Sequence, residues 1–114
     1  MDKLSTAFPS LSADLIDGLN QLTRLDLVKQ LEEAIVIDVT FDNSADAGYI
    51  SLKAGRKLNV VEQNIIRSHH GATLSVPCQH CAMLDIDNFG RVTGIEVLGP
   101  PAALKADLRA RARS

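Results

Sequence analysis

The sequence contains few aromatic residues and shows no strong excess of either charge. Its 114 residues include no tryptophan, one tyrosine and three phenylalanines, and the formal net charge is −2. A stacking platform for single-stranded nucleic acid needs several exposed aromatic rings, and so small a charge gives no general attraction to a polyanion. We therefore expect no nucleic-acid partner and a core built from leucine, isoleucine, valine and alanine.

Long apolar runs are also missing. No segment approaches the roughly 20 apolar residues that a helix needs to span a bilayer. The first 20 residues contain Asp2, Asp14 and Asp17 and lack the basic-then-apolar order of a signal peptide. Hydrophobic residues make up 46% and charged residues 23%, which is typical of a globular chain. These features predict a cytoplasmic, bacterial protein with no membrane partner, folded as a single domain over residues 1–114.

The first 34 residues predict a helical N-terminal extension. Ser12 can cap a helix with its hydroxyl, and Asp14 then lies near the positive end of the helix dipole. Leucines follow at spacings of four and three residues, which is one apolar stripe. Gly18 is expected to shorten this helix, and Thr23 begins a second one. We expect two short helices, or one kinked helix, over residues 12–34.

Near residue 35 the apolar spacing changes from every third or fourth position to every second. Residues 35–41 and 47–52 alternate as half-buried strands, joined by a polar turn. Further strands are expected at 58–66, 82–86 and 91–98, with a β-bulge at Val60 and Val61 and a short additional strand considered at 73–76. Gly90 is expected to take the left-handed conformation in the last hairpin. The fold class is therefore α+β: a small antiparallel β-meander of about five strands over residues 35–98, with the N-terminal helices on one face and a short C-terminal helix.

Residues 99–114 form a basic C-terminal helix or tail. Pro100 and Pro101 end the last strand and can begin a helix. Leu104 and Leu108 give this segment only one weak apolar edge. Its arginines alternate and would spread over a wide arc of a helix, so we expect a frayed, solvated tail. The basic residues are Lys105, Arg109, Arg111 and Arg113.

Two stretches together resemble a known family. The first, residues 39–52, contains Asp42 followed by Ala-Asp-Ala and Tyr-Ile, and the second, residues 84–98, reads Leu-Asp-Ile-Asp-Asn-Phe-Gly-Arg-Val-Thr-Gly-Ile-Glu-Val-Leu. This pattern resembles the small bacterial domain-of-unknown-function family twenty-two eighty-three, over residues 36–98. The resemblance implies a compact antiparallel meander and brings no catalytic residue. Because members are sometimes encoded beside toxin-like proteins, it also implies an antitoxin or regulatory role.

All the histidines and cysteines lie in one loop, which departs from the family pattern. Cys78 and Cys81 form a Cys-x-x-Cys whose thiolates can reach one ion, and His69 and His70 would complete a tetrahedral zinc site. Adjacent histidines on an extended chain point to opposite sides, so His80 is an alternative ligand. The other interpretation is an exposed loop with two thiols of no particular role. A redox role is disfavoured because no helix follows Cys78 to lower its pKa, and a reducing compartment disfavours a disulfide.

Carboxylates in the strand region are numerous enough to raise the question of catalysis. Most lie at turns, where aspartate is expected for backbone reasons, and neither a Ser-His-Asp order nor a phosphate-binding glycine loop is present. The spacing of residues 85–96 matches a calcium loop, but the alternation that follows favours a hairpin. The aspartates concerned are Asp38, Asp42, Asp46, Asp85 and Asp87.

We therefore predict a non-catalytic protein-interaction or regulatory module, antitoxin-like, that works through an exposed strand edge or the added helices. Its partner is expected to be another protein or a second copy in a symmetric homodimer. No cofactor is expected in this interpretation. The alternative is a zinc-binding variant whose loop over residues 69–81 is ordered by the metal.

Overall fold

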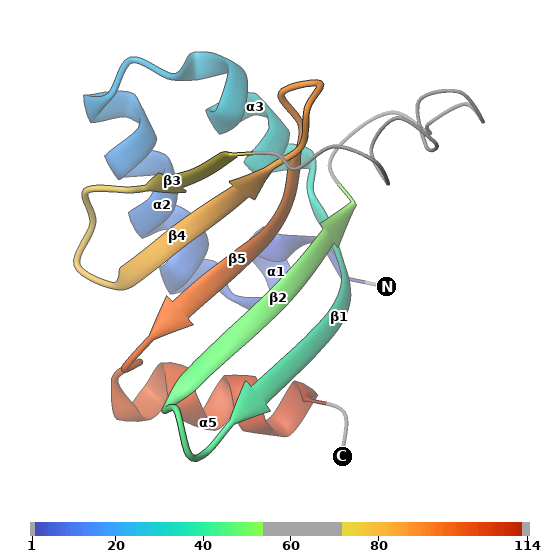
Figure 1. Ribbon diagram of the computed structural model, residues 1–114, viewed down its shortest axis with the longest axis vertical. Helices are drawn as coiled ribbons and strands as arrows, with labels where there is room; N and C mark the ends of the chain where they lie inside the picture. The colour runs from blue at the N-terminus through green and yellow to red at the C-terminus, as the bar shows by residue number, and fades with distance from the viewer. Residues whose placement is uncertain (1, 54–71, 113–114) are drawn as a thin grey trace.

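A computed structural model describes residues 2–53 and 72–112. Within these two ranges, three helices come first, followed by five strands and a C-terminal helix (Figure 1), so the predicted α+β class is confirmed. No helix within these two ranges is both long enough and apolar enough to cross a membrane. The elements are α1 (Leu4–Ala7), α2 (Pro9–Gln21), α3 (Leu25–Glu33), β1 (Ile35–Asp42), β2 (Ala47–Lys53), β3 (Ala72–Ser75), β4 (Cys81–Ile86), β5 (Val92–Leu98) and α5 (Ala102–Arg111).

The strands form one antiparallel sheet in the order β1-β2-β5-β4-β3. A β1–β2 hairpin and a β3–β4–β5 meander meet where β5 pairs with β2. The short strand considered at residues 73–76 is present as β3, shifted by one residue. The strand predicted at 58–66, with its bulge at Val60 and Val61, lies outside the described residues.

The helices cover one face of the sheet (Figure 1). Alternate residues of β2 are buried, because every second side chain points toward the helices. The core is almost entirely aliphatic, as the composition predicted, and Phe8 is the one aromatic ring among its fully buried side chains. The largest of these side chains are Phe8, Leu4, Leu11, Leu15, Leu19, Leu27, Leu31, Ile50, Leu84, Ile95, Leu108 and Val92.

The predicted start of the first long helix at Ser12 was wrong. Helix α2 begins at Pro9, because proline fits the first helical position, where its missing N–H leaves no bond unmade. Ser12 lies inside the helix, 2% exposed, and donates its N–H to the Phe8 carbonyl. Asp14 is therefore in the middle of α2 and not in its first turn, so its role has to come from tertiary contacts.

Gly18 does not shorten α2, which continues to Gln21. The missing side chain allows a close approach: a Cβ atom at Gly18 would lie 2.4 Å from the Pro77 carbonyl oxygen. Thr23 has φ +54° and separates α2 from α3. The predicted cap at Thr23 was also wrong, since its hydroxyl donates to the Leu22 carbonyl and α3 begins at Leu25.

The predicted short C-terminal helix is confirmed as α5, but it packs on the sheet, so the expectation that this segment is frayed and solvated was wrong. Leu104 and Leu108 are buried, and Leu108 packs on Gly48 of β2, where a Cβ atom would lie 2.8 Å from its Cδ1. The sequence pattern underestimated the apolar edge of this helix. Two leucines are enough to hold the helix on the sheet because Gly48 leaves room for Leu108. Basic residues of α5 fix its ends: Lys105 pairs with Asp46, Arg109 donates to Asn43, and Arg111 pairs with Asp2.

This packing predicts a large loss of stability for one Leu→Ala substitution and almost none for another. We expect Leu108→Ala to lower the free energy of unfolding by about 2–5 kcal/mol, because a fully buried side chain leaves a cavity. The matched control is Leu25→Ala, whose side chain is 66% exposed, and its effect should stay within about 0.5 kcal/mol. Urea unfolding followed by circular dichroism measures both. Equal effects for the two variants would show that α5 does not pack on the sheet.

Candidate functional sites: the cysteine and histidine loop and the edge of β1

Three of the five predicted zinc ligands lie in the loop between β3 and β4 or at the first residue of β4. Cys78 is half-buried against the core and Cys81 is exposed at the first residue of β4, and both thiols are free. His69 and His70 lie outside the described residues. Within residues 2–53 and 72–112, no group of three His, Cys, Asp or Glu side chains could hold a metal ion. The described residues therefore do not assemble a metal site, and zinc stays a prediction.

His80 makes a different contact, with Asp14 of α2. The Asp14 carboxylate accepts the backbone N–H groups of Gln79 (3.1 Å) and His80 (3.0 Å), and Nδ1 of the His80 ring lies 2.5 Å from its Oδ2. The two side chains are 15% and 12% exposed. Because an ionised carboxylate can only accept, Nδ1 carries a proton. These contacts of Asp14 with Gln79 and His80, the Asp14 cluster, connect the middle of α2 to the turn that precedes β4.

The same contacts set the ionisation of Asp14. Burial raises the pKa of this carboxyl group, but the hydrogen bonds from Gln79 and from the ring and backbone of His80 outweigh burial and hold its pKa below the ordinary value. A carboxyl group with a lowered pKa in the folded state stabilises the fold above its unfolded-state pKa. That stabilisation is lost as the pH falls through the folded-state pKa.

The Cys78 thiol is not activated. Its Sγ donates to the His80 carbonyl at 2.8 Å. Burial and the negative charge of Asp14 raise the pKa of this thiol, whereas a reactive or metal-binding cysteine needs the thiolate. Cys78 is thus held as a neutral thiol at neutral pH, and a metal ion would have to displace its proton.

Most of the predicted turn aspartates do serve turns. Asp42 accepts the N–H groups of residues 44 and 45, and Asp87 accepts those of residues 89 and 91. Asp46 has φ +49° and pairs with Lys105. Gly90 has φ +79° in the hairpin that leads to β5, so the hairpin interpretation of residues 85–96 is confirmed and the calcium loop is not formed. Asp38 lies on β1, directly after a β-bulge.

Asp85 lies in the middle of β4, on the face of the sheet away from the helices. Its carboxylate accepts the Tyr49 hydroxyl at 2.6 Å and the Thr73 hydroxyl at 3.1 Å. Gly94 leaves the space that the Tyr49 hydroxyl occupies, 2.1 Å from where a Cβ atom would lie. Burial, together with the charges of Asp85 and Glu96, raises the pKa of Tyr49. The Asp85 carboxylate is therefore engaged by the hydroxyl groups of Tyr49 and Thr73. These two hydrogen bonds join β4 to β2 and β3, so the role of Asp85 is structural.

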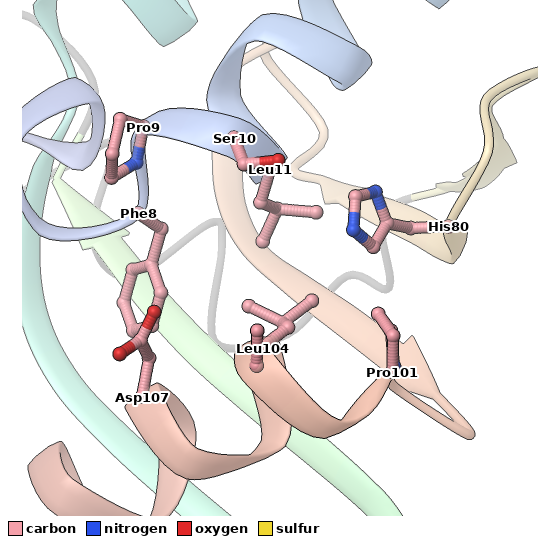
Figure 2. Close-up of a pocket in the computed structure, with 9 residues that line it drawn as sticks. Phe8, Pro9, Ser10, Leu11, His80, Pro101, Leu104 and Asp107 are labelled. Carbon is pink, nitrogen blue, oxygen red and sulfur yellow. The ribbon is translucent and has the colours of Figure 1, made fainter.

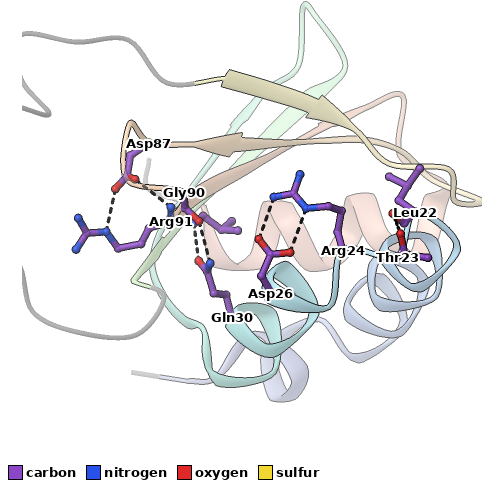
Figure 3. Close-up of polar contacts among 9 residues, drawn as sticks. Leu22, Thr23, Arg24, Asp26, Gln30, Asp87, Gly90 and Arg91 are labelled. Carbon is purple, nitrogen blue, oxygen red and sulfur yellow. Dashed lines mark hydrogen bonds and ion pairs between the residues drawn. The ribbon is translucent and has the colours of Figure 1, made fainter.

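Gln30 of α3 is a further residue that sequence reasoning missed. Its amide donates to the Gly90 carbonyl at 2.9 Å and accepts the Val92 N–H at 2.8 Å (Figure 3). The same figure shows Arg91 beside Asp87. A single side chain thus joins the helical layer to the β4–β5 hairpin, and no local pattern in the sequence indicates it.

The outer edge of β1 is the second candidate site. Val36 donates its N–H to the Asp2 carbonyl, and Lys3 forms a bridge with Ile35, so one end of this edge is covered. The register with β2 then shifts between Val36 and Asp38, which leaves Ile37 as a bulge residue, 48% exposed. Beyond the bulge, over residues 39–42, none of the described strands pairs with this edge. A groove of about 390 Å³ lies beside it, lined by Asp2, Val36, Ile37, Asp38, Val39 and Arg111.

The Asp14 cluster predicts a pH-dependent loss of stability. We expect Asp14→Ala to lower the free energy of unfolding by about 1–3 kcal/mol at neutral pH, because three donors lose their acceptor. The deficit should shrink below about pH 4, as the wild-type carboxyl group takes up its proton. Denaturant unfolding at a series of pH values measures this. Asp17→Ala, an exposed neighbour on α2, is the control; a deficit of the same size in both variants would contradict a specific role for Asp14.

In comparisons with known proteins, no family model, curated protein or solved structure matches the chain. The resemblance to domain-of-unknown-function family twenty-two eighty-three, and the role that it implies, therefore remain predictions.

Proposed function

We propose that this chain is a non-catalytic protein-interaction module that pairs through the outer edge of β1, and that its partner there is a second copy of the chain. The observation that carries the proposal is the edge over residues 39–42, which no described strand covers. An edge strand presents N–H and C=O groups that another strand can pair with.

The charges of β1 restrict the registers in which this strand can pair with a second copy of itself. Antiparallel pairing about a two-fold axis at Val39 sets Asp38 opposite Thr40 and leaves no like charges directly opposite one another. An axis at Thr40 would set Asp38 opposite Asp42, and an axis at Asp38 would oppose that residue to itself. Like charges directly opposite each other destabilise a strand pair, so the charges disfavour the axes at Asp38 and Thr40 and permit the axis at Val39.

The bulge at Ile37 limits the contact. Together with the Lys3–Ile35 bridge it ends the straight part of the edge, and a bulge twists an edge away from continued pairing. The expected product is a closed pair of chains and not an extended aggregate. The exposed Ile37 side chains and the adjoining grooves then border the contact.

The absence of catalysis in this proposal rests on what the aspartates already do. Asp42 and Asp87 hold turns, Asp46 pairs with α5, and Asp85 joins three strands. None of these contacts gives two carboxylates separate acid and base roles in one cleft. The antitoxin-like, regulatory role that the resemblance implies fits the same proposal, because a pair joined along β1 leaves both helical layers accessible to a further protein.

Opposite charges at Thr40 test the proposal. Thr40→Asp places a carboxylate opposite Asp38 of the other copy, and Thr40→Lys places an ammonium group there. Each dimer contains this pair twice, and cross-strand charge pairs contribute about 0.2–1 kcal/mol each. We expect a dimer dissociation constant about twofold to thirtyfold weaker for Thr40→Asp and correspondingly tighter for Thr40→Lys. Sedimentation equilibrium over a dilution series measures both constants.

The same two substitutions at Ser75, an exposed residue of the opposite edge strand β3, are the control. They should leave the dissociation constant unchanged. A wild-type chain that stays monomeric at every concentration contradicts the proposal, and so does a response that is equal in sign for Thr40→Asp and Thr40→Lys.

A second candidate function is zinc binding, favoured by the two free thiols of a Cys-x-x-Cys that border one surface depression with His80. His69 or His70, outside the described residues, would complete the ligand set. If zinc binds, the purified protein contains it in equimolar amount and a chelator lowers the melting temperature. Cys78→Ser and Cys81→Ser should each lose the metal, whereas Ser75→Ala, which borders the same depression, should keep it. Metal-free protein whose melting is unchanged by chelator removes this candidate.

A further inference from the structure

A partly enclosed pocket of about 140 Å³ lies between the start of α2, the start of α5 and the turn before β4 (Figure 2). Its walls are mostly apolar, and its polar groups belong to three side chains. The apolar residues are Phe8, Pro9, Leu11, Pro101, Ala103 and Leu104, and the polar ones are Ser10, His80 and Asp107.

The His80 ring projects into this pocket from the side opposite Phe8 (Figure 2). Its Nδ1 is held by Asp14 of α2, and the Asp14 carboxylate is itself fixed by two backbone N–H groups. With the ring proton on Nδ1, facing Asp14, Nε2 of the imidazole can accept a hydrogen bond. The structure gives Nε2 no hydrogen bond within residues 2–53 and 72–112. An acceptor of fixed direction therefore faces an apolar space.

We propose that this pocket binds a small neutral ligand that combines an unsaturated six-membered ring with a hydroxyl group, of which phenol is the simplest example. The size of the pocket sets the ring: an apolar cavity of about 150 Å³ is large enough to bind benzene. The hydroxyl group donates its proton to His80 Nε2, which satisfies the acceptor, while the ring contacts Phe8, Leu11 and Leu104.

The carboxylates of Asp14 and Asp107 disfavour an anionic ligand, and the apolar walls disfavour a cationic one. Asp14 stands behind the imidazole and Asp107 lies at the pocket wall, so a carboxylate or phosphate would meet two negative groups. A ligand cation would have to be desolvated against mostly apolar walls. The proposal does not rest on self-pairing of the chain, because none of the lining residues belongs to β1.

A pair of ligands that differ in the donor alone tests the site on the unmodified protein. Phenol and fluorobenzene have nearly the same size, but fluorobenzene has no O–H group. We expect phenol to bind about fivefold more tightly, since one neutral hydrogen bond separates them, and benzoate to show no saturable binding. Titrations followed by ¹H–¹⁵N NMR should show saturable shifts at the backbone amides of Leu11, His80 and Leu104.

Two substitutions separate the ring pocket from the acceptor. Leu104→Trp fills the space and should abolish the binding of both ligands, whereas His80→Phe should keep fluorobenzene binding and remove the advantage of phenol. Asp17→Ala, an exposed residue of α2 outside the pocket lining, is the control and should bind phenol as the wild type does. The dispersion of each NMR spectrum reports whether the variant is folded. If His80→Phe does not fold, the comparison of phenol with fluorobenzene on the wild-type protein still tests the proposal. Equal affinity of wild type for phenol and fluorobenzene, or saturable shifts confined to another surface, overturns the proposal.

Discussion

The contact between α2 and the turn before β4 determines where the candidate sites of this chain lie. Gly18 lets the backbone at Pro77 approach the helix, at a distance that any side chain would prevent. One helical turn earlier, Asp14 accepts three hydrogen bonds from Gln79 and His80. Because both contacts act on the same short turn, they fix the direction of the His80 ring and the partial burial of the Cys78 side chain. Without them, neither the pocket nor the thiol environment would be defined.

The fold was predictable where the signal is local and repeated. The change of apolar spacing near residue 35 correctly divided helices from strands, and short polar side chains correctly marked the turns at Asp42 and Asp87. The helix boundaries were less accurate, because Pro9 can begin a helix as readily as Ser12 can cap one. The packing of α5 could not be predicted from two leucines, since their burial depends on the room that Gly48 leaves on a distant strand.

The functional contacts were harder to predict for one physical reason, which is their separation along the chain. Asp14 and His80 are 66 residues apart, Gln30 and Gly90 are 60 apart, and Tyr49 and Asp85 are 36 apart. Each pair forms only after the helical layer and the sheet have packed together. A motif search groups residues that are near in sequence, so it joined His80 to the cysteines, whereas the structure joins its ring to a carboxylate on a helix.

A partner gains the most binding free energy at hydrogen-bonding groups that have no partner within the fold. A polar group already paired within the fold offers little to a ligand, because its bond must be broken before another can form. Most polar side chains described here are engaged: Asp85 with two hydroxyl groups, Gln30 with a carbonyl and an N–H, and Lys105 with Asp46. The backbone edge over residues 39–42 and Nε2 of His80 are two exceptions within the described ranges. The first suits an extended strand and the second a single donor on an apolar ring, so the two proposals concern different chemistry at different parts of the fold.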